Sequence, residues 1–255
     1  VELPQPPPDD GRVVLQVKVQ ERPPDDLKLG VGFGFSPIRW DEWVTARYTH
    51  RNLAHRLTRL DLRVKAGWTQ IPDPFDPQSD GPLVRVEPKL TRKGWLEPAL
   101  QWTLAPSYEL GVEQGYKFQA GRLRPGVSRF FLGKLRLALN HTLEIYDFFQ
   151  IEPDLNGAVT RLGLDFADPY LLSYLTLDGR LYLTDDLFEP TNGVVIGATW
   201  DLAGGALGGD FEFHRWMPEV SAYWKPAARL QLAARAQVGL IKAPADSGAP
   251  FAMKL

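Results

Sequence analysis

The chain has 255 residues, a formal net charge of −2 and no cysteine. The near-neutral charge gives no field that would attract nucleic acid, and the absence of cysteine excludes disulfides, thiol nucleophiles and cysteine metal sites. No run of about 18 consecutive apolar residues occurs, which excludes transmembrane helices.

The first regular pattern along the chain is VVLQVKVQ, at residues 13–20. It follows a proline-rich segment and ends before Pro23 and Pro24, so it predicts a short strand that is closed off on both sides. Because the later segments are longer, we expect residues 1–26 to be separate from the sheet that follows.

From residue 27 onward the chain is a series of alternating segments, and a side-chain period of two is typical of β-strands. Leu62 and Val64, for example, alternate with Arg63 and Lys65. Most segments approach the 9–11 residues of a tilted membrane strand, and together they predict about ten strands. Residues 71–82 are rich in Pro, Asp and Gly and are expected to form a surface loop. The expected strands cover residues 29–36, 44–49, 60–68, 96–104, 108–119, 135–145, 175–183, 194–202, 211–224 and 230–240.

Alternation alone is also found in soluble sandwiches and lipocalin-like barrels. Three features favour an all-β, antiparallel transmembrane β-barrel: the length of the strands, polar faces that carry both signs of charge, and aromatic residues at strand ends. Such aromatic side chains form girdles at the two membrane interfaces. The girdle candidates are Trp68, Trp102, Tyr116, Trp200 and Trp224.

Basic residues recur on the polar faces of these strands, and in a barrel those faces line the lumen. They would tune the selectivity of a passive pore or hold a loop inside an assembly barrel, and the sequence leaves both roles open. The candidates are Arg59, Arg63, Lys65, Arg136, Arg180 and Arg235.

The order of several segments resembles one known group of barrels. VVLQVKVQERPP resembles the last strand of a POTRA domain, and LKLGVGFGFSP resembles a glycine-rich first barrel strand. ARYTHRNLAHRLTRLDLRVKAGW resembles the next two strands. LYLTDDLFEPTNGVVIGATWDL resembles an acidic strand end followed by a Pro-x-x-Gly turn, here at Pro190 and Gly193. The chain therefore resembles the BamA/TamA-type superfamily of outer-membrane assembly and surface-antigen barrels.

The resemblance implies a non-enzymatic, cofactor-free protein of the outer membrane of bacteria, or of an organelle of bacterial descent. It implies that residues 1–26 end a periplasmic POTRA-like domain and that residues 27–255 are the N-terminal part of a sixteen-stranded barrel. Outer-membrane lipids, unfolded outer-membrane clients and periplasmic or inner-membrane accessory subunits are the implied partners. The family's Val-Arg-Gly loop motif and terminal aromatic strand are not found, so we expect a truncated chain.

In that family, the weak seam between the first and last strands would template client strands through an unpaired edge. Glycine in a strand weakens pairing and packing, so the seam candidate is the segment from Leu29 to Phe35. The alternative is that these glycines make room for a lumen loop or a sharp curve. The seam residues are Leu29, Gly30, Val31, Gly32, Phe33, Gly34 and Phe35.

Three other functions remain open: a two-partner secretion pore, a passive diffusion channel and an outer-membrane lipid hydrolase. The four histidines, His50, His55, His141 and His214, lack the spacing of a metal site. His141 falls on an apolar face, where a lipid hydrolase would need a nearby serine. Its own strand offers none, which makes the hydrolase the less favoured alternative.

Overall fold

The structure, a computed structural model, describes residues 23–54, 57–94, 96–151, 169–227 and 229–244. The strand expected at residues 13–20 lies outside these ranges, as does most of the expected 1–26 segment. The described elements are β1 (Asp25–Ser36), β2 (Arg39–Leu53), β3 (Thr58–Ile71), β4 (Ser79–Lys93), β5 (Leu100–Glu113), β6 (Tyr116–Phe131), β7 (Leu135–Phe149), β8 (Tyr170–Thr184), β9 (Gly193–Ala203), the 3-10 helix η1 (Gly205–Leu207), β10 (Phe213–Ala227), β11 (Leu230–Gln237) and β12 (Leu240–Lys242).

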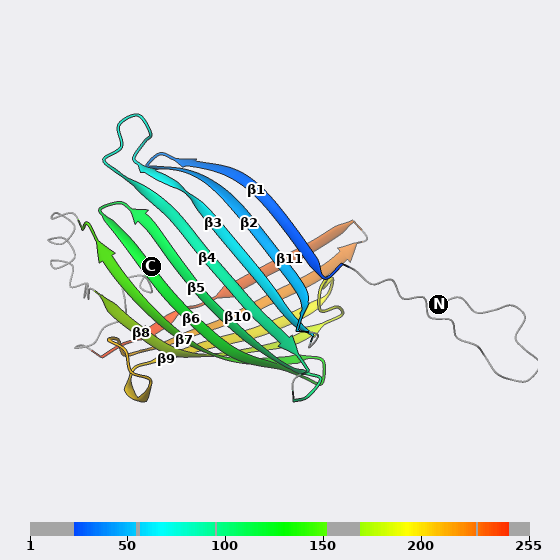
Figure 1. Cartoon of the computed structure of the whole chain (residues 1–255). Coiled ribbons are helices and arrows are strands. Elements are labelled where there is room, and N and C mark those ends of the chain that lie inside the picture. Colours follow the sequence, from blue (N-terminus) through cyan, green and yellow to red (C-terminus); the bar gives the residue numbers. More distant parts are fainter. Residues whose placement is uncertain (1–22, 55–56, 95, 152–168, 228, 245–255) are drawn as a thin grey trace, which may run out of the picture.

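Each strand from β1 to β11 pairs antiparallel with the next, and β12 continues along β10 beyond the end of β11. The sheet curls into a curved wall in which β8–β11 pass behind β4–β7 (Figure 1). The prediction of an all-β antiparallel fold is confirmed. Connections gather at two ends of the wall. Among the described residues, the turn end holds 54, 57, 94, 96–99, 132–134, 185–192 and 229; the loop end holds 37–38, 72–78, 114–115, 150–151, 169 and 204–212.

The two faces of the wall differ in chemistry because side chains alternate along each strand. The concave face bounds a cavity of about 870 Å³, lined by charged and hydroxyl side chains such as Arg63, Arg124 and Thr176. The opposite face exposes leucine, isoleucine and valine side chains, including Leu139 and Ile196. The wall thus has a polar inner face and an apolar outer face.

Strand β4 was not predicted, and the expected loop at residues 71–82 is too long, because β4 begins at Ser79. Prolines obscured this strand in the sequence. Proline has no N–H for the ladder, and the β4–β5 pairing is interrupted between Val86 and Leu90, where Pro88 lies. Pro106 of β5 falls in the same interruption, so the missing donors of the two strands coincide.

The single strand expected at residues 108–119 is wrong, because these residues belong to two strands. Gln114 and Gly115 form the turn between β5 and β6, and Gly115 has a φ of 91°. A two-residue turn restarts the alternation, so the residues after it do not keep the face assigned from those before it. Tyr116 is therefore on the same face of β6 as Arg122 and Arg124, which line the cavity.

Candidate functional site

Strand β1 is an edge of the sheet. All 12 of its residues pair with β2, from Asp25 opposite His50 to Ser36 opposite Arg39. Its other edge has no strand partner among the described residues. The outer face of β1 is strongly exposed, with Val31 at 86%. The predicted seam segment, Leu29 to Phe35, lies entirely within this edge strand.

The inner face of β1 carries three glycines, and one indole covers two of them. A Cβ built on Gly32 would lie 2.4 Å from ring atoms of Trp43, and one on Gly34 would lie 3.1 Å from the same ring. Lys65 lies on the neighbouring strand β3, and its Nζ atom is 3.9 Å from the centre of the Trp43 ring. The glycines therefore make room for Trp43 of β2, a residue that the sequence analysis did not identify.

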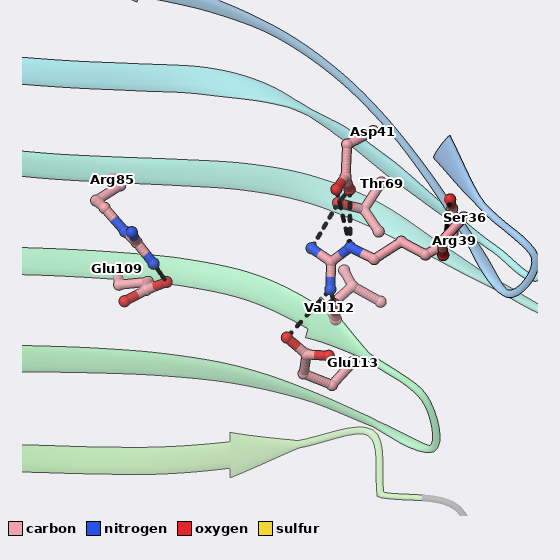
Figure 2. A network of polar contacts seen from close by, with 8 residues as sticks. All are labelled: Ser36, Arg39, Asp41, Thr69, Arg85, Glu109, Val112 and Glu113. Atoms are coloured by element: carbon pink, nitrogen blue, oxygen red, sulfur yellow. Dashed lines mark hydrogen bonds and ion pairs between the residues drawn. The ribbon is translucent and has the colours of Figure 1, made fainter. Parts of the chain in front are cut away.

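At the loop end, Arg39 ties three strands together on the inner face (Figure 2). Its guanidinium donates to Asp41 at 3.0 Å and to the hydroxyl of Thr69 at 3.4 Å. It also reaches β5, where it donates to the Val112 carbonyl and to Glu113, both at 3.1 Å. A single side chain from β2 thus fixes the curvature of the wall between β2 and β5.

Further along the wall, ion pairs join neighbouring strands across the inner face. Asp201 of β9 is 1% exposed and accepts hydrogen bonds from Arg215 Nε at 2.8 Å and from the Thr176 hydroxyl at 2.5 Å. Arg122 donates to Glu144 at 2.7 Å. The Arg122–Glu144 pair joins β6 to β7, and Asp201 of β9 joins β8 to β10.

The basic residues predicted to face the lumen lie on this inner face. Arg59, Arg63 and Arg136 line the cavity. Most are also paired: Arg59 with Asp61 at 2.7 Å, Arg136 with Asp178 at 2.7 Å, Arg180 with Asp178 at 3.5 Å and Arg235 with Glu219 at 2.8 Å. These acidic partners were not predicted from the sequence, although acids and bases share the same polar faces of the strands.

The loop end of the inner face is filled by aromatic rings. The planes of Tyr146 and Tyr170 stack with centroids 5.2 Å apart, and Phe118 stacks on Tyr146 at 5.0 Å. Tyr116 packs edge-on against Phe148 at 5.3 Å. The prediction that Tyr116 lies at a membrane interface is therefore wrong, because the turn before it places it in this inner cluster.

The other girdle candidates lie on the outer face. Trp68 is 41% exposed and its indole donates to Asp80 at 3.1 Å. Trp102 lies between two cavity-lining residues, so it points outward. Trp224 is exposed near the turn end. Trp200 stacks on Trp216, with ring centroids 4.8 Å apart and planes 8° from parallel.

A serine does lie beside His141, but on the neighbouring strand. Ser173 of β8 has its hydroxyl 2.9 Å from His141 Nε2. The strand of His141 itself offers no serine, and the register of β7 on β8 creates the contact. Ser173 is 1% exposed, which leaves no approach for a substrate carbonyl, so the pair satisfies two polar groups within the sheet.

Neither a metal site nor a membrane-spanning helix emerges from the part of the chain that the structure describes. No group of three or more His, Cys, Asp or Glu residues is placed to hold a metal ion there. No helix within the same ranges is long and apolar enough to cross a bilayer. The candidate site is therefore the β1 edge together with the two faces of the wall.

Comparison with known proteins identifies the fold. No family model matches the sequence, and no curated protein matches it. Among solved structures, the wall matches the crystal structure of BamA from Haemophilus ducreyi lacking POTRA domains 1–3, with a TM-score of 0.63 and 14% sequence identity. The match covers 99% of this chain and 48% of that chain, so the chain spans about half the length of that protein. The predicted barrel fold, and the resemblance to BamA/TamA-type barrels at the level of the fold, are confirmed.

Proposed function

We propose that the chain forms part of an outer-membrane barrel that inserts or translocates other outer-membrane proteins, with β1 as the strand that templates the client. The observation that carries the proposal is an edge strand of 12 residues with one free edge in the described sheet. An unpaired edge offers N–H and C=O groups to an incoming strand, which is the basis of β-augmentation.

The outer face supports a membrane setting, in the outer membrane of a bacterium or of an organelle of bacterial descent. On β6, polar Gln119 and Arg129 bracket an outward row that includes Leu123 and Val127. At 3.4 Å per residue and a tilt near 45°, these two polar residues lie roughly 24 Å apart across the wall, close to the ~25 Å height of the apolar band of membrane barrels. Hydrocarbon contact explains why so many large apolar side chains are exposed.

The two edges of the wall are unequal templates. β1 is continuous, whereas β11 ends at Gln237 and β12 begins only at Leu240. An incoming strand could pair along the whole of β1 but along only 8 residues of β11 before the break. The clients would be unfolded barrel chains, and the POTRA-like segment at residues 1–26 would receive them together with periplasmic or inner-membrane accessory subunits.

Single cysteines test the client site cleanly because the chain has none of its own. Val31→Cys should form disulfides with cysteines at alternate positions of a client's terminal strand during insertion into vesicles. Leu177→Cys is the matched control, since Leu177 is also exposed on the outer face but lies in β8, which is paired on both sides. Equal cross-linking at both positions, or none at Val31 during active insertion, would exclude β1 as the template.

A further inference from the structure

We propose that the outer rim of the wall at the turn end, over β4–β7, binds the headgroup of an anionic phospholipid. We call this rim the headgroup patch and define it by Arg92, Leu96, Trp102, Arg129, Leu132 and Lys134. The inference rests on the proposed membrane setting. It adds the class of lipid that the wall binds and assigns that lipid to the leaflet at the turn end.

The cations of the patch point away from the lumen. Thr91 and Lys93 line the cavity, so Arg92 between them faces outward. Arg129 pairs with Leu137 of β7, which is exposed on the outer face, so Arg129 faces outward too. Lys134 is exposed in the turn between β6 and β7. These three cations, on β4, on β6 and in the β6–β7 turn, stand beyond the apolar band. They lie at the level where phosphate groups of a leaflet would be.

Arg129 has donors to spare. Its Nη2 donates to Glu97, and its Cζ lies 4.4 Å from the centre of the Phe131 ring. The Arg129 side chain is still 39% exposed. A guanidinium carries five N–H donors in a planar fork that matches a phosphate, so a headgroup oxygen can reach exposed donors that Glu97 does not use.

Glu97 is the one acid in residues 92–102 and 127–136. Of the five basic residues in these ranges, Lys93 and Arg136 line the cavity, which leaves Arg92, Arg129 and Lys134 for the patch. Since Arg129 already neutralises Glu97, the excess charge of the patch is positive. The rim at the loop end has the opposite sign on its outer face, where Trp68 donates to Asp80 and Gln119 donates to Asp147. An anionic headgroup is therefore attracted to the turn end and repelled from the loop end.

The turns of the patch carry leucines at exposed positions, where contact between an apolar side chain and water is unfavourable. Leu132 is 99% exposed and has a φ of 49°, and Gly133 after it has a φ of 67°. Asn-Gly is the usual choice where two successive turn residues have positive φ, and a leucine with positive φ is strained. Leu96, in the turn between β4 and β5, is 75% exposed. At the boundary between headgroups and acyl chains these side chains would be buried in lipid.

A lipid fits this order of groups because cations lie at the rim and an apolar surface follows directly above them. Val127 and Leu139 are both 44% exposed on the outer face and face the same side as the patch. Phosphate would lie against the cations while the acyl chains run along these side chains. Trp102 lies between the cations of the rim and the apolar surface, as an interfacial aromatic residue does.

The charge test compares outward and inward cations of the same region. Arg92→Gln with Lys134→Gln removes two outward charges, and Lys89→Gln with Lys93→Gln removes two that line the cavity. Spin-labelled phosphatidylglycerol and phosphatidylcholine report the relative association of each lipid with the full chain in vesicles. We expect phosphatidylglycerol to be preferred by the wild-type chain, and the outward pair to lower that preference about fivefold per charge removed. The inward pair should keep it.

An absence of phosphatidylglycerol preference, or an equal loss in both double variants, would overturn the headgroup patch. Leu132→Asn gives a second measurement, because asparagine suits the positive φ. It should raise the unfolding temperature in zwitterionic micelles and lower it, relative to wild type, in phosphatidylglycerol vesicles. An identical change in both media would count against burial of Leu132 in lipid.

Two other outcomes separate this inference from the proposed function. If brominated phosphatidylcholine fails to quench the outer tryptophans, the membrane setting itself is wrong. If quenching occurs but the two lipids associate equally, only the headgroup patch is wrong. Self-association that Leu132→Asn abolishes, without lipid preference, would make the patch a contact between copies of the chain and would also overturn the lipid assignment.

Discussion

Strands β1 and β8 run through the same sheet but are held in different ways. β8 pairs with strands on both sides, and its inner face carries buried Tyr170, Leu172 and Tyr174. β1 pairs with β2 alone, and the middle of its inner face has only glycines, two of which lie under Trp43. Stability in this part of the wall is therefore concentrated away from β1, and the edge strand that we propose as a template is easier to displace than β8.

The largest effect should come from the well-packed part of the wall around β8, where Asp201 of the neighbouring strand β9 is buried. Asp201→Ala would leave Arg215 and Thr176 without their shared acceptor, and removal of one partner of a buried ion pair costs about 3 kcal/mol or more. Urea unfolding of the refolded barrel measures the loss. Asp76→Ala, at an exposed position in a loop, should change the unfolding free energy little. An Asp201→Ala chain as stable as wild type would contradict the ranking of the two regions.

At the β1 edge, Gly32→Ala should destabilise β1 specifically. The new methyl group would overlap the Trp43 ring, and overpacking of this kind costs about 1–3 kcal/mol. Hydrogen exchange should accelerate in β1 and stay unchanged in β8. Gly121→Ala is the control, because a Cβ there meets no atom within 4 Å. Combining Gly32→Ala with Trp43→Ala should restore slower exchange, and failure to do so would rule out the steric cause.

A smaller effect is expected for Lys65→Met, which keeps the length of the side chain and removes its charge. The ammonium group lies 3.9 Å from the Trp43 ring centre, and a partly exposed cation–π contact contributes about 0.5–1 kcal/mol. Exchange in β1 should rise modestly, and the change should vanish in a Trp43→Leu background. An equal change in both backgrounds would show that Lys65 acts through another contact.

The smallest effect concerns the turn at residues 185–192. The Thr191 hydroxyl and the backbone N–H of Asn192 donate to Asp185 and lower the pKa of its carboxyl below the ordinary 3.8. Because the folded pKa is the lower one, the turn is stabilised above about pH 4 and loses that stabilisation as pH falls toward the folded value. Proteolysis of the turn should therefore increase only in acid, and Asp185→Asn should increase it already at pH 7.

Much of the wall could be read from alternation, and the exceptions have local causes. β3 and β7 alternate cleanly and were predicted. β4 was missed because Pro82 and Pro88 interrupt the pattern, and Tyr116 was placed on the wrong face because a two-residue turn restarts the alternation. Alternation along the sequence gives the side-chain period of a strand but not the positions at which the strand begins and ends.

The site was harder to predict because its contacts depend on register. The glycines marked β1 as unusual, but Trp43 meets them only because the turn at residues 37–38 sets Gly32 opposite Trp43. That turn was a usable signal, since a two-residue connection fixes which residues of a hairpin pair. The contact between His141 and Ser173 had no such signal, because a connection of 20 residues separates β7 from β8.

The parallel indoles of Trp200 and Trp216 give the protein a built-in optical reporter. Two chromophores so close share their excitation, and the handed twist between β9 and β10 should make that shared transition appear as paired bands of opposite sign in circular dichroism. The bands would rise when these two strands align, independently of total β content. Assembly of the far side of the wall could thus be followed in real time without any label.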